Sequence, residues 1–140
     1  MSERTRLDAQ ADGSVRVPVN DALGFELAAR DRDEVTFTWT VAPEHCNSAG
    51  GVQGGMLAAF ADAVLGAAAA AHLPSDRYPA LVHMGLSLMR PARAGERLTA
   101  TARAVKTGRR VLFVEARVTN ADGELVATAT GTEIPADAPD

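Results

Sequence analysis

An isolated carboxylate, Asp62, lies in a run that is otherwise apolar from Met56 to Ala71, shortly after the pair Gly54-Gly55. A helix that is hydrophobic on all sides is a buried helix, and an ionised carboxylate inside one costs several kcal/mol unless it is paired, hydrogen-bonded or solvated by a cleft. Because the surrounding residues are mostly alanine and leucine, an alanine at position 62 would pack equally well. The acid is therefore predicted to be present for chemistry rather than for stability.

The glycine pair stands where the predicted helix begins. The first N–H groups of a helix have no partner within it, and the positive end of the helix dipole favours negative charge. The nine residues from Asn47 to Gly55 include four glycines, which predicts a loop that passes close to another group. Asp62 lies about 12 Å along the helix from Gly54 at a rise of 1.5 Å per residue. One subunit therefore does not easily bring both groups to one reacting carbon atom.

Composition excludes several classes of protein. The 140 residues suffice for one domain with a core, and a net charge of −4 argues against general nucleic-acid binding. The apolar run is too short and too alanine-rich to span a bilayer. A single cysteine, Cys46, forms no internal disulfide, which favours a reducing cytoplasm. With His45, His72 and His83 it gives no metal-ligand spacing, so no metal site is expected.

The pattern along the chain predicts one α+β domain over residues 18–134, with flexible tails at 1–17 and 135–140. The alternation of Val35, Phe37, Trp39 and Val41 with threonines is typical of a half-buried strand. A long helix follows the glycines, and an antiparallel meander follows the helix. The predicted elements are a helical turn at 20–23, strands at 25–29 and 35–41, a helix from 53 or 54 to about 73, and strands at 80–90, 98–106, 111–120 and 125–134.

Several of these segments, taken together, resemble one known family. The chain is similar over residues 18–134 to hotdog-fold acyl-CoA thioesterases, and more narrowly to the phenylacetate-pathway (PaaI-like) branch. The resemblance implies an antiparallel sheet wrapped around one long central helix. It rests on Asn47-Ser48-Ala49-Gly50-Gly51-Val52-Gln53-Gly54-Gly55, Phe60-Ala61-Asp62, Gly66, Met89-Arg90-Pro91-Ala92-Arg93-Ala94-Gly95-Glu96, Gly108-Arg109 and Asp122-Gly123.

The resemblance also implies catalytic roles. The Gly54 N–H would polarise the thioester carbonyl, and Asp62 from the opposite helix of a dimer would act as nucleophile or general base. Asn47 would orient the attacking water or the thioester. The family's usual histidine before the glycines is Gln53 here, which can hydrogen-bond but cannot titrate near neutral pH. Gly66 stands where some relatives carry a threonine that assists the acid, and it offers no hydroxyl.

Acyl-CoA is the expected substrate and no separate cofactor is expected. Met56, Ala59, Phe60, Ala63, Met84 and Met89 are predicted to form an apolar slot for an aryl or medium-chain acyl group. Basic side chains near two turns could receive the phosphates and pantetheine arm of coenzyme A. The predicted substrate-binding residues are Gly55, Gly66, Arg90, Arg93, Lys106, Arg109 and Arg110.

Two other functions remain open at this level. Because the family's usual histidine is missing, a non-catalytic acyl-CoA-binding module is one alternative. A hotdog enoyl-CoA hydratase is less favoured, because no histidine lies between Cys46 and Ala71. The leading hypothesis is a cytoplasmic thioesterase without nucleic-acid or membrane partners. It works as a homodimer with shared active sites, assembled into a homotetramer.

Overall fold

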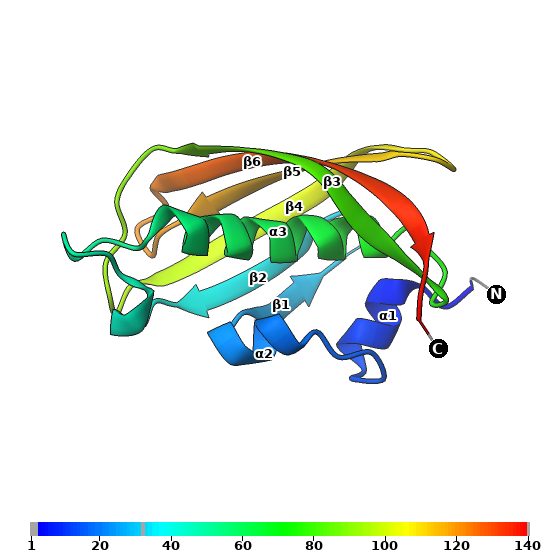
Figure 1. Ribbon diagram of the computed structural model, residues 1–140, viewed down its shortest axis with the longest axis horizontal. Coiled ribbons are helices and arrows are strands. Elements are labelled where there is room, and N and C mark those ends of the chain that lie inside the picture. Colours follow the sequence, from blue (N-terminus) through cyan, green and yellow to red (C-terminus); the bar gives the residue numbers. More distant parts are fainter. Residues whose placement is uncertain (1–2, 32, 140) are drawn as a thin grey trace.

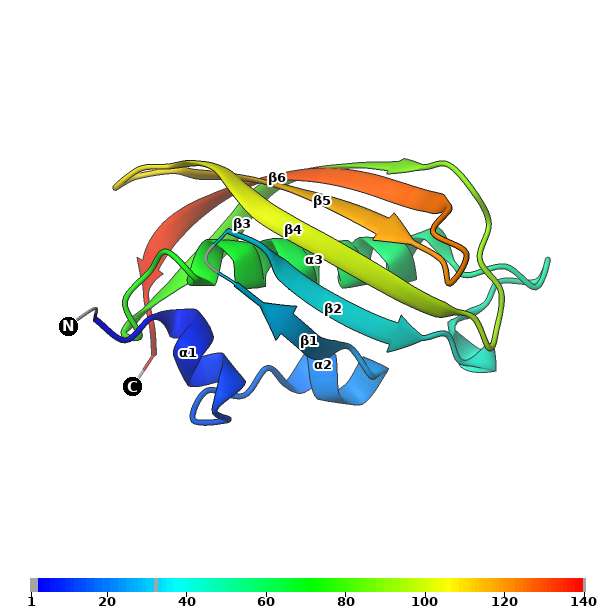
Figure 2. The same ribbon diagram turned by 180° about the vertical axis from the view of Figure 1, so that it is seen from behind.

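A single antiparallel sheet curves around one long helix, α3 (Gly54–Ala70) (Figure 1). The computed structural model describes residues 3–31 and 33–139. The sheet has six strands in the order β1-β2-β4-β5-β6-β3, so β1 and β3 are its edges. Figure 2 shows the same arrangement from behind. The remaining elements are α1 (Arg6–Ala11), α2 (Pro18–Leu23), β1 (Glu26–Arg30), β2 (Val35–Thr40), a 3-10 turn (Pro43–His45), β3 (Arg77–Leu88), β4 (Arg97–Thr107), β5 (Leu112–Thr119) and β6 (Leu125–Asp137).

The predicted alternation in β2 is confirmed by burial. Val35, Phe37 and Trp39 are buried, while the intervening threonines are only partly covered. Trp39 packs against Phe60 of α3 with ring centroids 5.2 Å apart, and Phe25 closes the same aromatic cluster at 5.2 Å from Trp39. This contact joins the sheet to the middle of the helix, because aromatic rings contribute large buried areas.

Helix α3 is buried on most of its surface but not on all of it. The sheet covers Leu57, Phe60 and Val64, whereas Asp62 is exposed and Gly66 is half-buried. The expectation of a helix buried all round is therefore wrong for the single chain, since one curved sheet encloses only part of a cylinder. The uncovered side is formed by small residues around Asp62 and lies toward β3. None of the helices in the described part of the chain has the length and apolar character needed to cross a membrane.

The N-terminal segment differs from the tail expected at 1–17. Thr5 and Asp8 form a reciprocal capping box at the start of α1, and Leu7 is 2% exposed. Arg6 ties the helix to the turn after α3, because its N–H donates to the Leu73 carbonyl at 2.8 Å. A six-residue helix is too short to show a clear period in sequence, so only its tertiary contacts reveal it.

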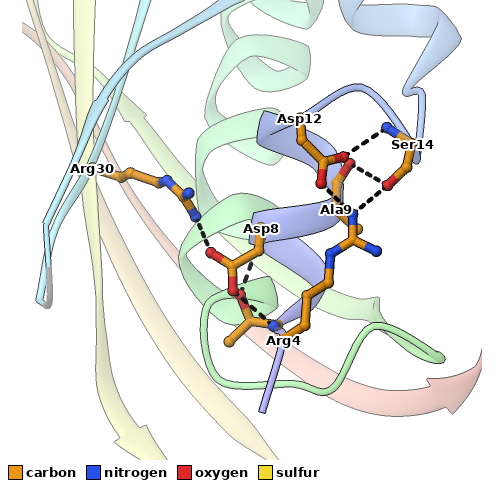
Figure 3. A network of polar contacts seen from close by, with 7 residues as sticks. Arg4, Asp8, Ala9, Asp12, Ser14 and Arg30 are labelled. Carbon is orange, nitrogen blue, oxygen red and sulfur yellow. Dashed lines mark hydrogen bonds and ion pairs between the residues drawn. The ribbon is translucent and has the colours of Figure 1, made fainter. Parts of the chain in front are cut away.

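Charged side chains brace α1 against the sheet (Figure 3). Arg30 of β1 pairs with Asp8 at 2.5 Å, and Arg4 pairs with Asp12, which also accepts from the Ser14 N–H. The Thr5 N–H and the Arg30 guanidinium lower the pKa of Asp8 to about 2. Both pairs are partly exposed, so they orient the helix more than they stabilise the fold.

The C-terminal strand also extends past the boundary expected at 134. β6 pairs with β3 as far as Arg77↔Asp137, so residues 135–137 belong to the sheet. Two proline residues, Pro79 and Pro135, face each other in this register, and such a position is tolerated toward a sheet edge. Residues 1, 2 and 140 of the predicted tails lie outside the described residues.

The docking of α1 gives a direct test. Leu7→Ala is expected to lower the free energy of unfolding by about 2–5 kcal/mol, because it opens a cavity under a buried side chain. Urea denaturation followed by far-UV circular dichroism measures the change. Val105→Ala is the matched control, since Val105 is 56% exposed. A loss no larger than the control's would mean that α1 is not docked in solution.

Candidate functional site

The glycine-rich loop before α3 is shaped by Asn47. Its Oδ1 accepts the N–H groups of Ala49 at 3.0 Å and Gly51 at 3.3 Å, and Gly50 takes a φ of +84°, which favours glycine. The amide oxygen of Asn47 is thus used within the loop. Its predicted catalytic role stays a prediction, and the observed geometry gives it a part in shaping the loop.

Two unpartnered N–H groups mark the start of α3. Within the described chain, the N–H groups of Gly54 and Gly55 donate to no acceptor. A Cβ on Gly54 would lie 3.2 Å from Leu88 Cδ1, whereas one on Gly55 would meet nothing within 4 Å. The preceding Gln53 is extended (φ −61°, ψ 133°), and its exposed side chain does not cap the helix. The helix therefore begins with free donors at an accessible surface, as an oxyanion-binding site requires.

Asp62 projects from the uncovered side of α3 into a cleft of about 290 Å³. Partial desolvation among apolar neighbours raises the pKa of its carboxyl group. Small residues of α3 form one wall, and Tyr78 and Pro79 of β3 form part of another. The wall contributed by α3 consists of Ala59, Asp62, Ala63, Gly66, Ala67 and Ala70.

The segment between α1 and α2 closes the cleft. Val15 and Val17 of this segment line it together with Asn20 of α2, so part of the tail expected at 1–17 supplies a wall beside Asp62. Asn20 is 7% exposed and its Oδ1 has no hydrogen-bond partner. Of the residues expected to line an acyl slot, Ala59 and Ala63 do so. Phe60 does not, because it is fully buried in the aromatic core. Met56, Met84 and Met89 do not line this cleft either.

A second carboxyl group, absent from the sequence-based predictions, lies beside the first. Glu133 of β6 is 1% exposed, and its Oε2 has no hydrogen-bond partner. Burial and the nearby charge of Asp62 raise its pKa to about 7. The signal for it was present in the alternation of β6, where Ala127, Ala129 and Gly131 are buried and Glu133 continues the same face.

The predicted coenzyme A residues fall into two groups at opposite ends of the sheet (Figure 1, Figure 2). Arg93 packs against the glycine loop from outside it, and its Nη1 lies 3.4 Å from a Cβ placed on Gly50. Arg90 pairs with Glu124 at 3.0 Å. The other group is on the β4–β5 hairpin, far from Gly54 in the same subunit, and comprises Lys106, Arg109 and Arg110.

The histidines and the cysteine lie apart from this chemistry. His45 Nδ1 accepts the Ala42 N–H at 3.0 Å, and its ring packs on Trp39. Cys46 is half-buried, and its Sγ lies 3.8 Å from the Ala42 carbonyl oxygen. The described residues contain no group of three or more side chains suited to a metal ion.

Comparisons with known proteins include the helix start and the acid of α3. A family model described as the thioesterase superfamily matches residues 49–127, which include Gln53, Gly54 and Asp62. A Pseudomonas aeruginosa protein named as an esterase is 31% identical over 81% of this chain and 85% of its own. The solved phenylacetic acid degradation-related thioesterase of Ralstonia eutropha is 33% identical, with a TM-score of 0.85 over 92% of this chain and 98% of that one. A Streptococcus mutans structure bound to acetyl CoA shares the fold at 22% identity, with a TM-score of 0.77 over 90% of this chain and 96% of that one.

Glu133 predicts an unusual pH dependence of stability. Its pKa is 4.5 without the fold and about 7 within it, so its contribution is full below pH 4.5 and is lost as the pH rises to 7. In Glu133→Gln this pH-dependent loss in the free energy of unfolding, up to about 3 kcal/mol at pH 8, should be absent. Urea unfolding of both proteins from pH 4.5 to 8 measures the difference. The exposed Glu26→Gln is the control. If the free energy of unfolding fell equally with pH in the wild type and in Glu133→Gln, the prediction would be contradicted.

Proposed function

We propose that the site of this chain hydrolyses acyl-CoA to a free acid and coenzyme A, because the chain belongs to the thioesterase superfamily. The similarity to the solved phenylacetic acid degradation-related thioesterase confirms the predicted resemblance to phenylacetate-pathway thioesterases and the predicted hotdog fold. The chain is thus a thioester hydrolase. The observation that carries the finer proposal is the pair of free N–H donors at the start of the helix that also bears Asp62.

The chemistry follows from these groups. A thioester carbonyl bound at Gly54 would place its oxygen against the N–H, which stabilises the negative charge that develops on attack. Asp62 would either attack the carbonyl carbon or remove a proton from a water that attacks it. In both routes the C–S bond breaks, coenzyme A leaves as the thiol, and water supplies the second oxygen of the acid. Gln53 would hydrogen-bond the thioester.

The two groups belong to different subunits in this proposal. Gly54 and Asp62 are fixed on one rigid helix about 12 Å apart, so they cannot meet on one carbon atom. Strand β3 is an unpaired sheet edge in the single chain, and Val82, Leu88 and Met89 are each more than half exposed there. A second copy paired along this edge would cover the open side of α3. The site would thereby be shared in a homodimer, and two dimers would form the homotetramer.

Substrate binding would follow the same division. Arg93, whose side chain reaches Gly50 of the glycine loop, would bind the phosphates of coenzyme A, and the fold neighbour bound to acetyl CoA supports this type of ligand. Lys106, Arg109 and Arg110 of the β4–β5 hairpin would contact coenzyme A only if another subunit of the assembly brought it close to them. The cleft of about 290 Å³ has apolar walls of alanines, valines and Tyr78 and a polar rim that includes Arg6, Arg16 and Asp62. The apolar walls would hold an aryl or medium-chain acyl group. A cytoplasmic location fits this substrate.

Replacing the acid tests the reaction. Asp62→Asn should lower kcat/KM for the best acyl-CoA by about 10²–10⁴-fold, because the amide is neither a base nor a nucleophile. Release of free thiol from an acyl-CoA panel is the measurement. The exposed Asp76→Asn carries the same chemical change and should retain full activity.

Three results would argue against this function. Wild-type turnover by Asp62→Asn would remove the acid from the mechanism. Tight acyl-CoA binding by the wild type without thiol release would favour a binding module. Hydration of an enoyl-CoA without thiol release would favour a hydratase.

A hybrid dimer tests the sharing of the site. Gly54→Pro removes the donor, while proline is tolerated as the first helical residue and Gln53 already has the backbone that precedes proline. Gly54→Pro and Asp62→Asn homodimers should both be inactive. A tandem-tagged hybrid of the two should regain about half of wild-type activity, since one of its two sites is intact. An inactive hybrid would mean that each subunit uses its own Gly54 and Asp62.

A further inference from the structure

Glu133 occupies a position where the fold calls for an apolar side chain. It continues the helix-facing row of β6, and its neighbours across the ladder are Leu112 of β5 and Leu81 of β3. It is 1% exposed, and Oε2 has no hydrogen-bond partner. A leucine there would avoid the cost of burying a carboxyl group. The acid is therefore not explained by packing.

The carboxyl group of Glu133 lies on the side of α3 that carries Asp62. Gly66 is four residues after Asp62 on the same side of α3, and a Cβ there would lie 3.9 Å from Glu133 Oε1. The missing side chain of Gly66 thus leaves the carboxyl group of Glu133 beside the helix. The charge of Asp62 reaches it strongly enough to oppose ionisation of Glu133.

The described structure gives Glu133 no ion-pair partner. Asp62 is the titratable group that faces it from α3. On β3, Arg77 lies 3.2 Å from Asp137, and its Nη2 donates to the Pro135 carbonyl. The β5 neighbour is Leu112. Arg6, Arg16 and Tyr78 also line the cleft beside Asp62, where Arg6 donates to the Ser75 carbonyl and Arg16 pairs with Asp21. The two acids therefore form a pair of like groups, and ionising both costs more free energy than ionising one.

We propose that Glu133 is a positioning residue whose charge, set beside the helix one turn from Asp62, sets the basicity of the catalytic acid. This inference rests on the proposed function of Asp62. Once Asp62 has ionised in the acid range and until Glu133 ionises near pH 7, the pair carries one charge, which resides on the more exposed Asp62. When Glu133 loses its proton near pH 7, a second negative charge beside Asp62 raises the proton affinity of Asp62 and makes it a stronger base or nucleophile.

The pH dependence of kcat/KM provides the first test. The wild type should show a rise in the acid range as Asp62 ionises, and a second, several-fold rise centred near pH 7. Glu133→Gln should keep the first rise and lack the second, because a neutral amide replaces the protonated carboxyl group. Glu133→Leu should give the same single rise, which separates the charge from the hydrogen-bonding capacity. Glu26→Gln should match the wild type. A second rise near pH 7 in either Glu133 variant would overturn the proposal.

A titration without substrate provides the second test. Carboxyl ¹³C NMR of Glu133 should show a midpoint near pH 7 in the wild type, shifted down by about one pH unit in Asp62→Asn, where the opposing charge is absent. An unchanged midpoint would overturn the coupling of Glu133 to Asp62. If the wild type releases thiol from no acyl-CoA, the proposed function fails, and the titration still decides whether the two acids are coupled.

Discussion

The enclosure of one helix by one curved sheet is the constraint on which the rest of the molecule depends. The concave face of six strands covers the side of α3 that carries Leu57, Phe60 and Val64, and the contact of Phe60 with Trp39 holds the two layers together. A sheet that also ends at an unpaired edge strand, β3, cannot cover the opposite side of the helix. That uncovered side carries Asp62 among small residues. The exposure of the acid is thus a consequence of the architecture, and no local feature of the helix is needed to explain it.

The same helix separates Gly54 and Asp62, the two groups on which the proposed chemistry depends. Its first N–H groups are free because helix geometry gives them no partner, and the acid follows two turns later on a rigid rod. Rigidity makes both groups well placed but prevents them from meeting within one chain. Assembly is therefore part of the proposed mechanism, since it would cover the apolar edge of β3 and complete the site in one step.

The surroundings of Asp62 are supplied by segments far away in sequence. The α1–α2 segment closes the cleft on one side, and β6 brings Glu133 close to the helix on the other. Both neighbours reduce the contact of the acid with water, and Glu133 adds a like charge when it ionises. The combination is typical of a site where the basicity of a carboxylate is adjusted by its environment. It also costs stability, because a buried, unpartnered acid is retained where an apolar residue would pack.

The sequence by itself determined the strands, the long helix and the helix start at Gly54, and it singled out Asp62 as the candidate acid, since each is encoded by local spacing, composition or resemblance. Local patterns could not determine the docking of α1, because six residues are too few to show a helical period. Nor could they separate Arg93 at the glycine loop from Lys106, Arg109 and Arg110 at the far end of the sheet. The pairing of Glu133 with Asp62 joins positions that are distant in the chain, and their proximity arises only when β6 packs beneath α3. Long-range contacts of this kind depend on the path of the whole chain, so only the tertiary structure decided them.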